Sequence, residues 1–88
     1  MAWRIDFKEQ AIKNLKKLDR PVQLELIHYL EGRIAAHSDP CRFGSPLSKD
    51  KKGLWRYRVG DYRIICRIEL ENKRLLVLVV GHRKEVYE

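Results

Sequence analysis

Two neighbouring stretches of the chain, residues 54–59 and 62–68, each combine an apolar face with a basic one, which is the pattern of half-buried β-strands. Their shared apolar face comprises Trp55, Tyr57, Val59, Tyr62, Ile64, Cys66 and Ile68. The opposite face comprises Arg56, Arg58, Arg63, Ile65 and Arg67. The intervening Gly60-Asp61 is a reverse-turn signal, so we expect a β-hairpin whose apolar face must be covered by other elements.

The remaining elements can be assigned from the same kind of pattern. Residues 3–7 alternate as a short strand, and residues 75–80 are apolar enough for a central strand. Two amphipathic helices lie between them. The helix nearer the N-terminus would bury Phe7, Ala11, Leu15 and Leu18 with Ile12 beside them, and the next would bury Leu26, Leu30 and Ile34. Asp6 and Glu9 have capping-box spacing, and Pro21 suits the first turn of the second helix.

This order predicts an α+β fold in a single domain spanning residues 1–88. An N-terminal strand is followed by an antiparallel hairpin of two helices and then by a three-stranded antiparallel meander. The helices would pack on one face of the sheet. Residues 38–53 would form a loop that is long for so small a domain, and long loops tend to be functional or mobile.

The net charge points to an anionic partner. Lys and Arg outnumber Asp and Glu by 19 to 12, giving a formal charge of +7, of which +5 lies in residues 45–88. A basic surface of this kind fits a nucleic acid, although it also fits an acidic protein or a solubility function. Neither cysteine has zinc-site spacing, and no signal peptide or membrane span is evident, so we expect a cytoplasmic protein without metal or cofactor.

The basic face of the hairpin is the main candidate site. Arg56 and Arg58 project on the same side of their strand, and Arg63 opens the partner strand across the turn. Like charges on neighbouring strands repel, so an anionic ligand would explain the cluster better than stability does, although a solvated outer face is the alternative. Near the C-terminus, Tyr87 is either an aromatic residue packed on the sheet or a phenol beside the arginines. On residues alone, this is a basic sheet face for RNA or DNA.

The same segments carry a family resemblance. Residues 54–65, residues 80–87 and the helix over residues 7–18 resemble the RelE branch of the RelE/ParE toxin superfamily, in the right order over essentially the whole chain. The resemblance implies a RelE-like fold and a ribosome-dependent endoribonuclease that cleaves mRNA. It also implies a cognate antitoxin, with ribosome and mRNA as the other partners and no membrane.

The resemblance further implies the chemistry and its residues. The ribose 2′-hydroxyl attacks the adjacent phosphate, leaving a 2′,3′-cyclic phosphate and a 5′-hydroxyl. The candidate catalytic residues are Arg58, Arg63, Arg83, Tyr87 and His82. The candidate RNA contacts are Arg56, Arg67 and three loop lysines, Lys49, Lys51 and Lys52. Well-known members carry lysines where this chain has Arg56 and Arg58, and arginine is a poor proton acceptor, so the general base is expected to be Tyr87 or His82.

Two other functions are compatible with the same fold. The ParE branch inhibits DNA gyrase and cleaves no RNA, but it usually lacks the Arg and Tyr set seen here. A catalytically inactive homologue would serve only as an antitoxin-binding module. Reaction products separate these possibilities, since only the nuclease leaves cyclic-phosphate ends.

Overall fold

The computed structural model describes residues 3–37, 39–47 and 53–84. The strands are β1 (Arg4–Phe7), β2 (Ser45–Pro46), β3 (Leu54–Val59), β4 (Tyr62–Glu69) and β5 (Arg74–His82). The helices are α1 (Glu9–Lys16), α2 (Arg20–Tyr29), the π-helical turn Leu30–Ile34 that continues α2, and the short 3-10 turn Pro40–Arg42. No helix in the described ranges has the length and apolar character needed to span a membrane.

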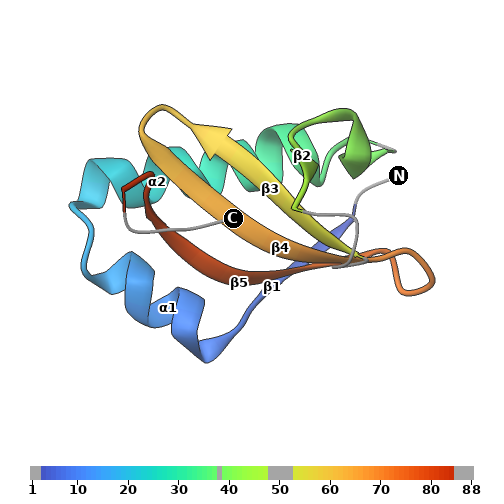
Figure 1. Ribbon diagram of the computed structural model, residues 1–88, viewed down its shortest axis with the longest axis horizontal. Coiled ribbons are helices and arrows are strands. Elements are labelled where there is room, and N and C mark those ends of the chain that lie inside the picture. The colour runs from blue at the N-terminus through green and yellow to red at the C-terminus, as the bar shows by residue number, and fades with distance from the viewer. Residues whose placement is uncertain (1–2, 38, 48–52, 85–88) are drawn as a thin grey trace.

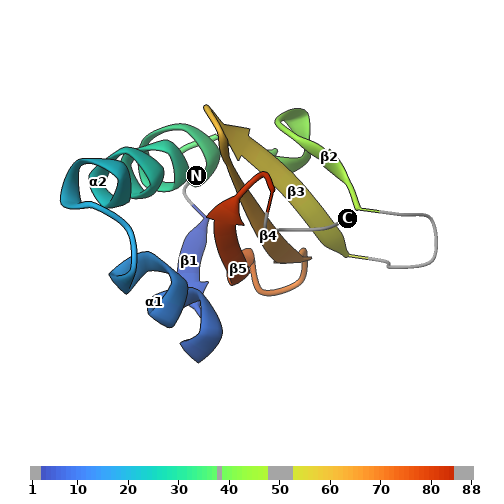
Figure 2. The ribbon, with the colours of Figure 1, turned by 60° about the vertical axis from the view of Figure 1, so that its left-hand side comes forward.

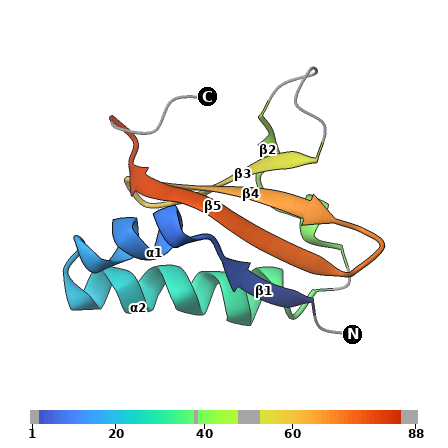
Figure 3. The ribbon, with the colours of Figure 1, turned by 90° about the horizontal axis from the view of Figure 1, so that it is seen from below.

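The five strands form one sheet in the order β1-β5-β4-β3-β2 (Figure 1). The predicted meander is confirmed, since β3, β4 and β5 pair antiparallel in sequence. The N-terminal strand β1 runs parallel to β5, which makes β5 central, as its apolar sequence predicts. Both helices lie on one face of the sheet, so the predicted α+β class is confirmed (Figures 2 and 3).

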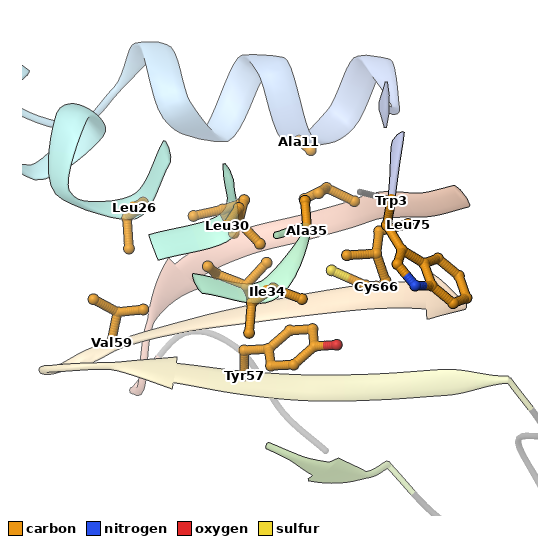
Figure 4. Packing of buried hydrophobic residues seen from close by; sticks show 13 residues of the cluster. Trp3, Ala11, Leu26, Leu30, Ile34, Ala35, Tyr57, Val59, Cys66 and Leu75 are labelled. Atoms are coloured by element: carbon orange, nitrogen blue, oxygen red, sulfur yellow. The ribbon is translucent and has the colours of Figure 1, made fainter. Parts of the chain in front are cut away.

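The core lies between the helices and the apolar face of the β3–β4 hairpin (Figure 4). The predicted stripe of α2 is fully buried: Leu26, Leu30 and Ile34 are at most 1% exposed. These side chains belong to the same buried cluster as Tyr57, Val59, Ile64, Cys66, Leu75, Val77 and Val80. The α1 stripe is only partly as expected, because Ala11 is buried whereas Ile12 remains 41% exposed on the outer side of the helix.

A β-bulge changes the alternation of β5. Ile65 pairs with Val79 and Cys66 pairs with Val77, so Leu78 is an extra residue opposite β4. Before the bulge Leu75 and Val77 face the core, and after it Val80 does. The side chains from residue 79 onward therefore lie on the faces opposite to those that an unbroken strand would give them.

The predicted capping box is wrong. Lys8, not Asp6, is the N-cap of α1, and it makes no side-chain cap. Asp6 accepts hydrogen bonds from Arg4 and Arg74, both at 3.2 Å, and Arg74 also binds Glu69 at 2.8 Å. Hydrogen bonds from Arg74 and Asn72 lower the pKa of Glu69 to about 2. The Asp6 carboxylate thus joins β1 to the β4–β5 hairpin instead of capping a helix.

Residues 40–47, which we call the strap, are fastened to the outer edge of β3. The phenol of Tyr57 donates to the carbonyl of Pro40 at 2.9 Å, and Trp55 Nε1 donates to the carbonyl of Phe43. The backbone of β2 pairs with residues 55 and 56 of β3. Part of the predicted 38–53 loop is therefore an ordered edge of the sheet.

Tyr57→Phe is expected to lower the free energy of unfolding by about 0.5–1.5 kcal/mol, because it removes the phenol's hydrogen bond to the buried Pro40 carbonyl, which keeps only the long bond from the Phe43 N–H. Burial also raises the pKa of the Tyr57 phenol, so the stability it contributes is present below the unfolded-state pKa of about 10 and is lost as the pH rises above it. Urea titrations from pH 7 to 10.5 would measure both effects. A stability difference between wild type and variant that did not narrow above pH 10 would contradict this account.

Candidate functional site

The candidate site occupies the sheet face that points away from the helices, which we call the open face. Cross-strand pairing arranges its residues in rows. The first row contains Arg58, Arg63 and Gly81. The second row contains Ser45, Arg56, Ile65 and Val79. The third row contains Asp6, Leu54, Arg67 and Leu76. The predicted basic face of the hairpin is thus a continuous surface running from β2 to β5.

Three arginines form a compact cluster at one end of this face. Arg58 is the direct cross-strand partner of Arg63, which places their Cβ atoms about 5 Å apart. Arg56 lies two residues along β3, about 7 Å from Arg58. Burial, followed by the charges of Arg63 and Arg58, lowers the pKa of Arg56. Such a group of guanidinium donors is suited to binding and stabilising a phosphate.

Arg83 lies at the same end of the sheet. The backbone N–H of Arg83 donates to the carbonyl of Asp61 at 2.8 Å, which holds Arg83 beside the turn that joins Arg58 to Arg63. The Arg83 side chain is exposed. The structure therefore brings Arg83 to the end of the sheet that carries the arginine cluster.

His82 lies on the other face. It pairs with Tyr62, and the two rings make an edge-to-face contact with centroids 5.7 Å apart. Tyr62 packs against the core on the helix side of the sheet. The Leu78 bulge causes this placement, because it moves His82 away from the face that carries the arginines.

The other candidate residues divide into two groups. Arg67 is exposed on the open face opposite Leu54, two rows from Arg63 and separate from the compact cluster. Tyr87, Lys49, Lys51 and Lys52 lie outside the described residues. Within the described ranges, no three His, Cys, Asp or Glu side chains gather as a set of metal ligands.

Ser45 is a residue of the site that the sequence did not reveal. Its hydroxyl accepts a hydrogen bond from Arg56 Nη2 at 2.9 Å. The contact depends on the pairing of β2 with β3, eleven residues further along the chain. A serine in a segment of Gly, Pro and Ser carries no local signal of such a role.

Sequence comparison identifies a family with this architecture. Residues 5–87 match the family model described as the ParE toxin of the type II toxin-antitoxin system parDE. The chain is also 29% identical over 87 residues to toxin RelG of Mycobacterium tuberculosis, a match covering 99% of this chain and 98% of that protein.

Solved structures show the same fold. The toxin-antitoxin complex RelBE2 of M. tuberculosis matches with a TM-score of 0.84 at 27% identity, covering 97% of this chain and 95% of that one. The isolated RelE toxin of E. coli matches with a TM-score of 0.71 at 20% identity, covering 92% and 84%. The shared fold extends through both the helical layer and the sheet that carries the arginines.

Proposed function

The chain belongs to the RelE branch of the RelE/ParE superfamily of type II toxin-antitoxin toxins, and from this premise we propose that it is an endoribonuclease that cleaves mRNA on the ribosome. The observation that carries the proposal is the pairing of Arg58 with Arg63, with Arg56 beside them and Arg83 at the same end of the open face. Stability alone disfavours this concentration of like charge, whereas a phosphate would compensate for it.

In the proposed reaction, the ribose 2′-hydroxyl attacks the adjacent phosphorus and the 5′-oxygen leaves, giving a 2′,3′-cyclic phosphate and a 5′-hydroxyl. Charge accumulates on the phosphate oxygens in the transition state, where Arg58 and Arg63 would donate hydrogen bonds. Arg56 and Arg67 would bind the phosphates of the RNA strand. The lysines at positions 49, 51 and 52 would extend the same contact.

The proton transfers need other groups, because arginine remains protonated at physiological pH. We assign the general base to Tyr87, whose phenolate a neighbouring cationic cluster would favour. His82 lies on the helix side of the sheet, away from the arginines, which supports Tyr87 over His82 as the general base. Arg83 would support the leaving oxygen from its position beside the Asp61 turn.

The proposed partners are the ribosome with its mRNA and an antitoxin. The M. tuberculosis RelBE2 structure is a toxin-antitoxin complex, which supports an equivalent partner for this chain. An antitoxin segment that is acidic or amphipathic would suit the arginine cluster. An antitoxin complex that left Arg56 and Arg58 fully open would argue against direct blocking of the site.

The test is induction of wild type and Tyr87→Phe in cells, with mRNA ends mapped by primer extension. Wild type is expected to arrest growth with new cuts inside translated frames, and the variant is expected to lose most of that cleavage, about 10²–10⁴-fold for removal of a general base. Growth arrest with intact mRNA would instead favour gyrase inhibition, the second candidate, which the ParE family model supports. Neither arrest nor cleavage would indicate an inactive antitoxin-binding homologue.

A further inference from the structure

The guanidinium of Arg56 is held by a side chain from a different strand. Arg56 Nη2 donates to Ser45 Oγ at 2.9 Å, and the two residues are direct partners in the β2–β3 pair. Both side chains are half-buried. The hydroxyl therefore lies beside the arginine cluster at the outer edge of the sheet.

Arg56 needs such a partner because its neighbours repel it. Burial lowers the pKa of Arg56, and Arg63 and Arg58 are close enough to lower it further. A long arginine side chain has considerable rotamer freedom, and repulsion favours conformers that point away from the cluster. A hydrogen bond to a fixed acceptor counters both effects.

The acceptor is neutral, and it is rigidly placed. A carboxylate at position 45 would also bind Arg56, but it would cancel part of the positive charge that a phosphate requires. The backbone before Ser45 is fixed by Gly44, which has φ +67° and packs against the carbonyl of Arg56. Trp55 Nε1 holds the strap at Phe43.

We propose that Ser45 is a positioning residue that orients Arg56 toward the RNA phosphate while leaving the charge of the cluster intact. The inference rests on the proposed nuclease function. It concerns binding of the RNA strand, so its effect belongs to substrate affinity and not to the saturated rate.

The experiment measures single-turnover cleavage of a defined mRNA on stalled ribosomes as a function of toxin concentration. Ser45→Ala is expected to raise the half-saturating concentration about tenfold, the usual worth of a hydrogen bond to a charged group. The saturated rate should stay within about twofold. Ser45→Thr keeps the hydroxyl and should show wild-type affinity. Ser45→Asp should weaken RNA affinity more than Ser45→Ala does, because the carboxylate neutralises part of the positive charge of the cluster.

A double-mutant cycle with Arg56→Ala separates positioning from general loosening of the strap. If Ser45 acts through Arg56, Ser45→Ala has no further effect once Arg56 is absent. Tyr57→Phe is the matched control, because it weakens the strap at Pro40 without touching the Ser45–Arg56 contact. It should lower stability without changing the half-saturating concentration.

The outcomes distinguish the inference from the function on which it rests. If wild type cleaves mRNA but Ser45→Ala matches it, lowers only the saturated rate, or adds its full effect to Arg56→Ala, the positioning role is overturned and the nuclease stands. If wild type leaves mRNA intact, the proposed function fails, and the inference fails with it.

Discussion

Replacing Arg63 by alanine is expected to lower the rate of mRNA cleavage about 10²–10³-fold, the usual cost of losing one donor to a developing oxyanion. Arg63 lies directly opposite Arg58 and shares with it the charge of the proposed transition state. The free energy of unfolding should change by less than about 1 kcal/mol, because the substitution relieves a like-charge pair on adjacent strands. Loss of activity without loss of stability is the expected signature of a catalytic residue.

Quenched-flow cleavage of ribosome-bound mRNA and urea unfolding measure the two quantities on the same preparations. Arg63→Lys should recover only part of the rate, since lysine keeps the charge but not the planar fork of donors. Arg20→Ala removes the same charge from the exposed N-terminal end of α2 and should retain nearly full activity. A comparable loss of cleavage rate in Arg63→Ala and Arg20→Ala would mean that net charge, and not the position of Arg63, accounts for the effect.

Gly44→Ala is expected to destabilise the protein by about 2–5 kcal/mol, combining left-handed backbone strain with overpacking. Gly44 has φ +67°, and a Cβ there would lie 2.1 Å from the carbonyl oxygen of Arg56 and 2.8 Å from Cδ1 of Tyr57. The closest atom belongs to the backbone of β3, so it can yield only if β2 separates from that strand. The Ser45–Arg56 hydrogen bond should be lost as a result, and RNA affinity with it.

Gly60→Ala is the matched control for this prediction. Gly60 also has a positive φ, +58°, but nothing lies within 4 Å of the Cβ that would be added. Only the backbone strain remains, so the cost should be about 1–2 kcal/mol. Urea unfolding of both variants gives the comparison, and equal losses would show that the contact with β3 contributes nothing.

Much of the fold follows from local patterns in the chain. The alternation in residues 54–59 and 62–68 separates core from open face correctly because side-chain direction has a period of two along a strand. The partners of Asp6 were not predictable in the same way. Its spacing from Glu9 suits a helix cap, yet its carboxylate binds Arg74, 68 residues away, and only the parallel pairing of β1 with β5 brings the two together.

The candidate site, too, was predictable from the sequence only in part. The opposition of Arg58 and Arg63 follows from a two-residue turn, which fixes the register of the hairpin. The role of Ser45 requires β2, a strand of two residues within a segment that reads as a loop. The face on which His82 lies could not be predicted from the sequence, because nothing in an apolar run of leucines and valines marks the residue that bulges.

That bulge has a consequence for how such a sheet can evolve. Leu78 shifts the phase of the strand by one, so that Val80 and His82 turn to the helices while Val79 and Gly81 turn to the arginines. Loss of the Leu78 codon would remove the bulge but leave both sets on their present faces, because Val79 would then follow Val77 in simple alternation. His82 would reach the arginine face only if Leu78 entered the ladder with no residue lost, so the choice between imidazole and glycine on that face depends on whether this one residue bulges as much as on the composition of the strand.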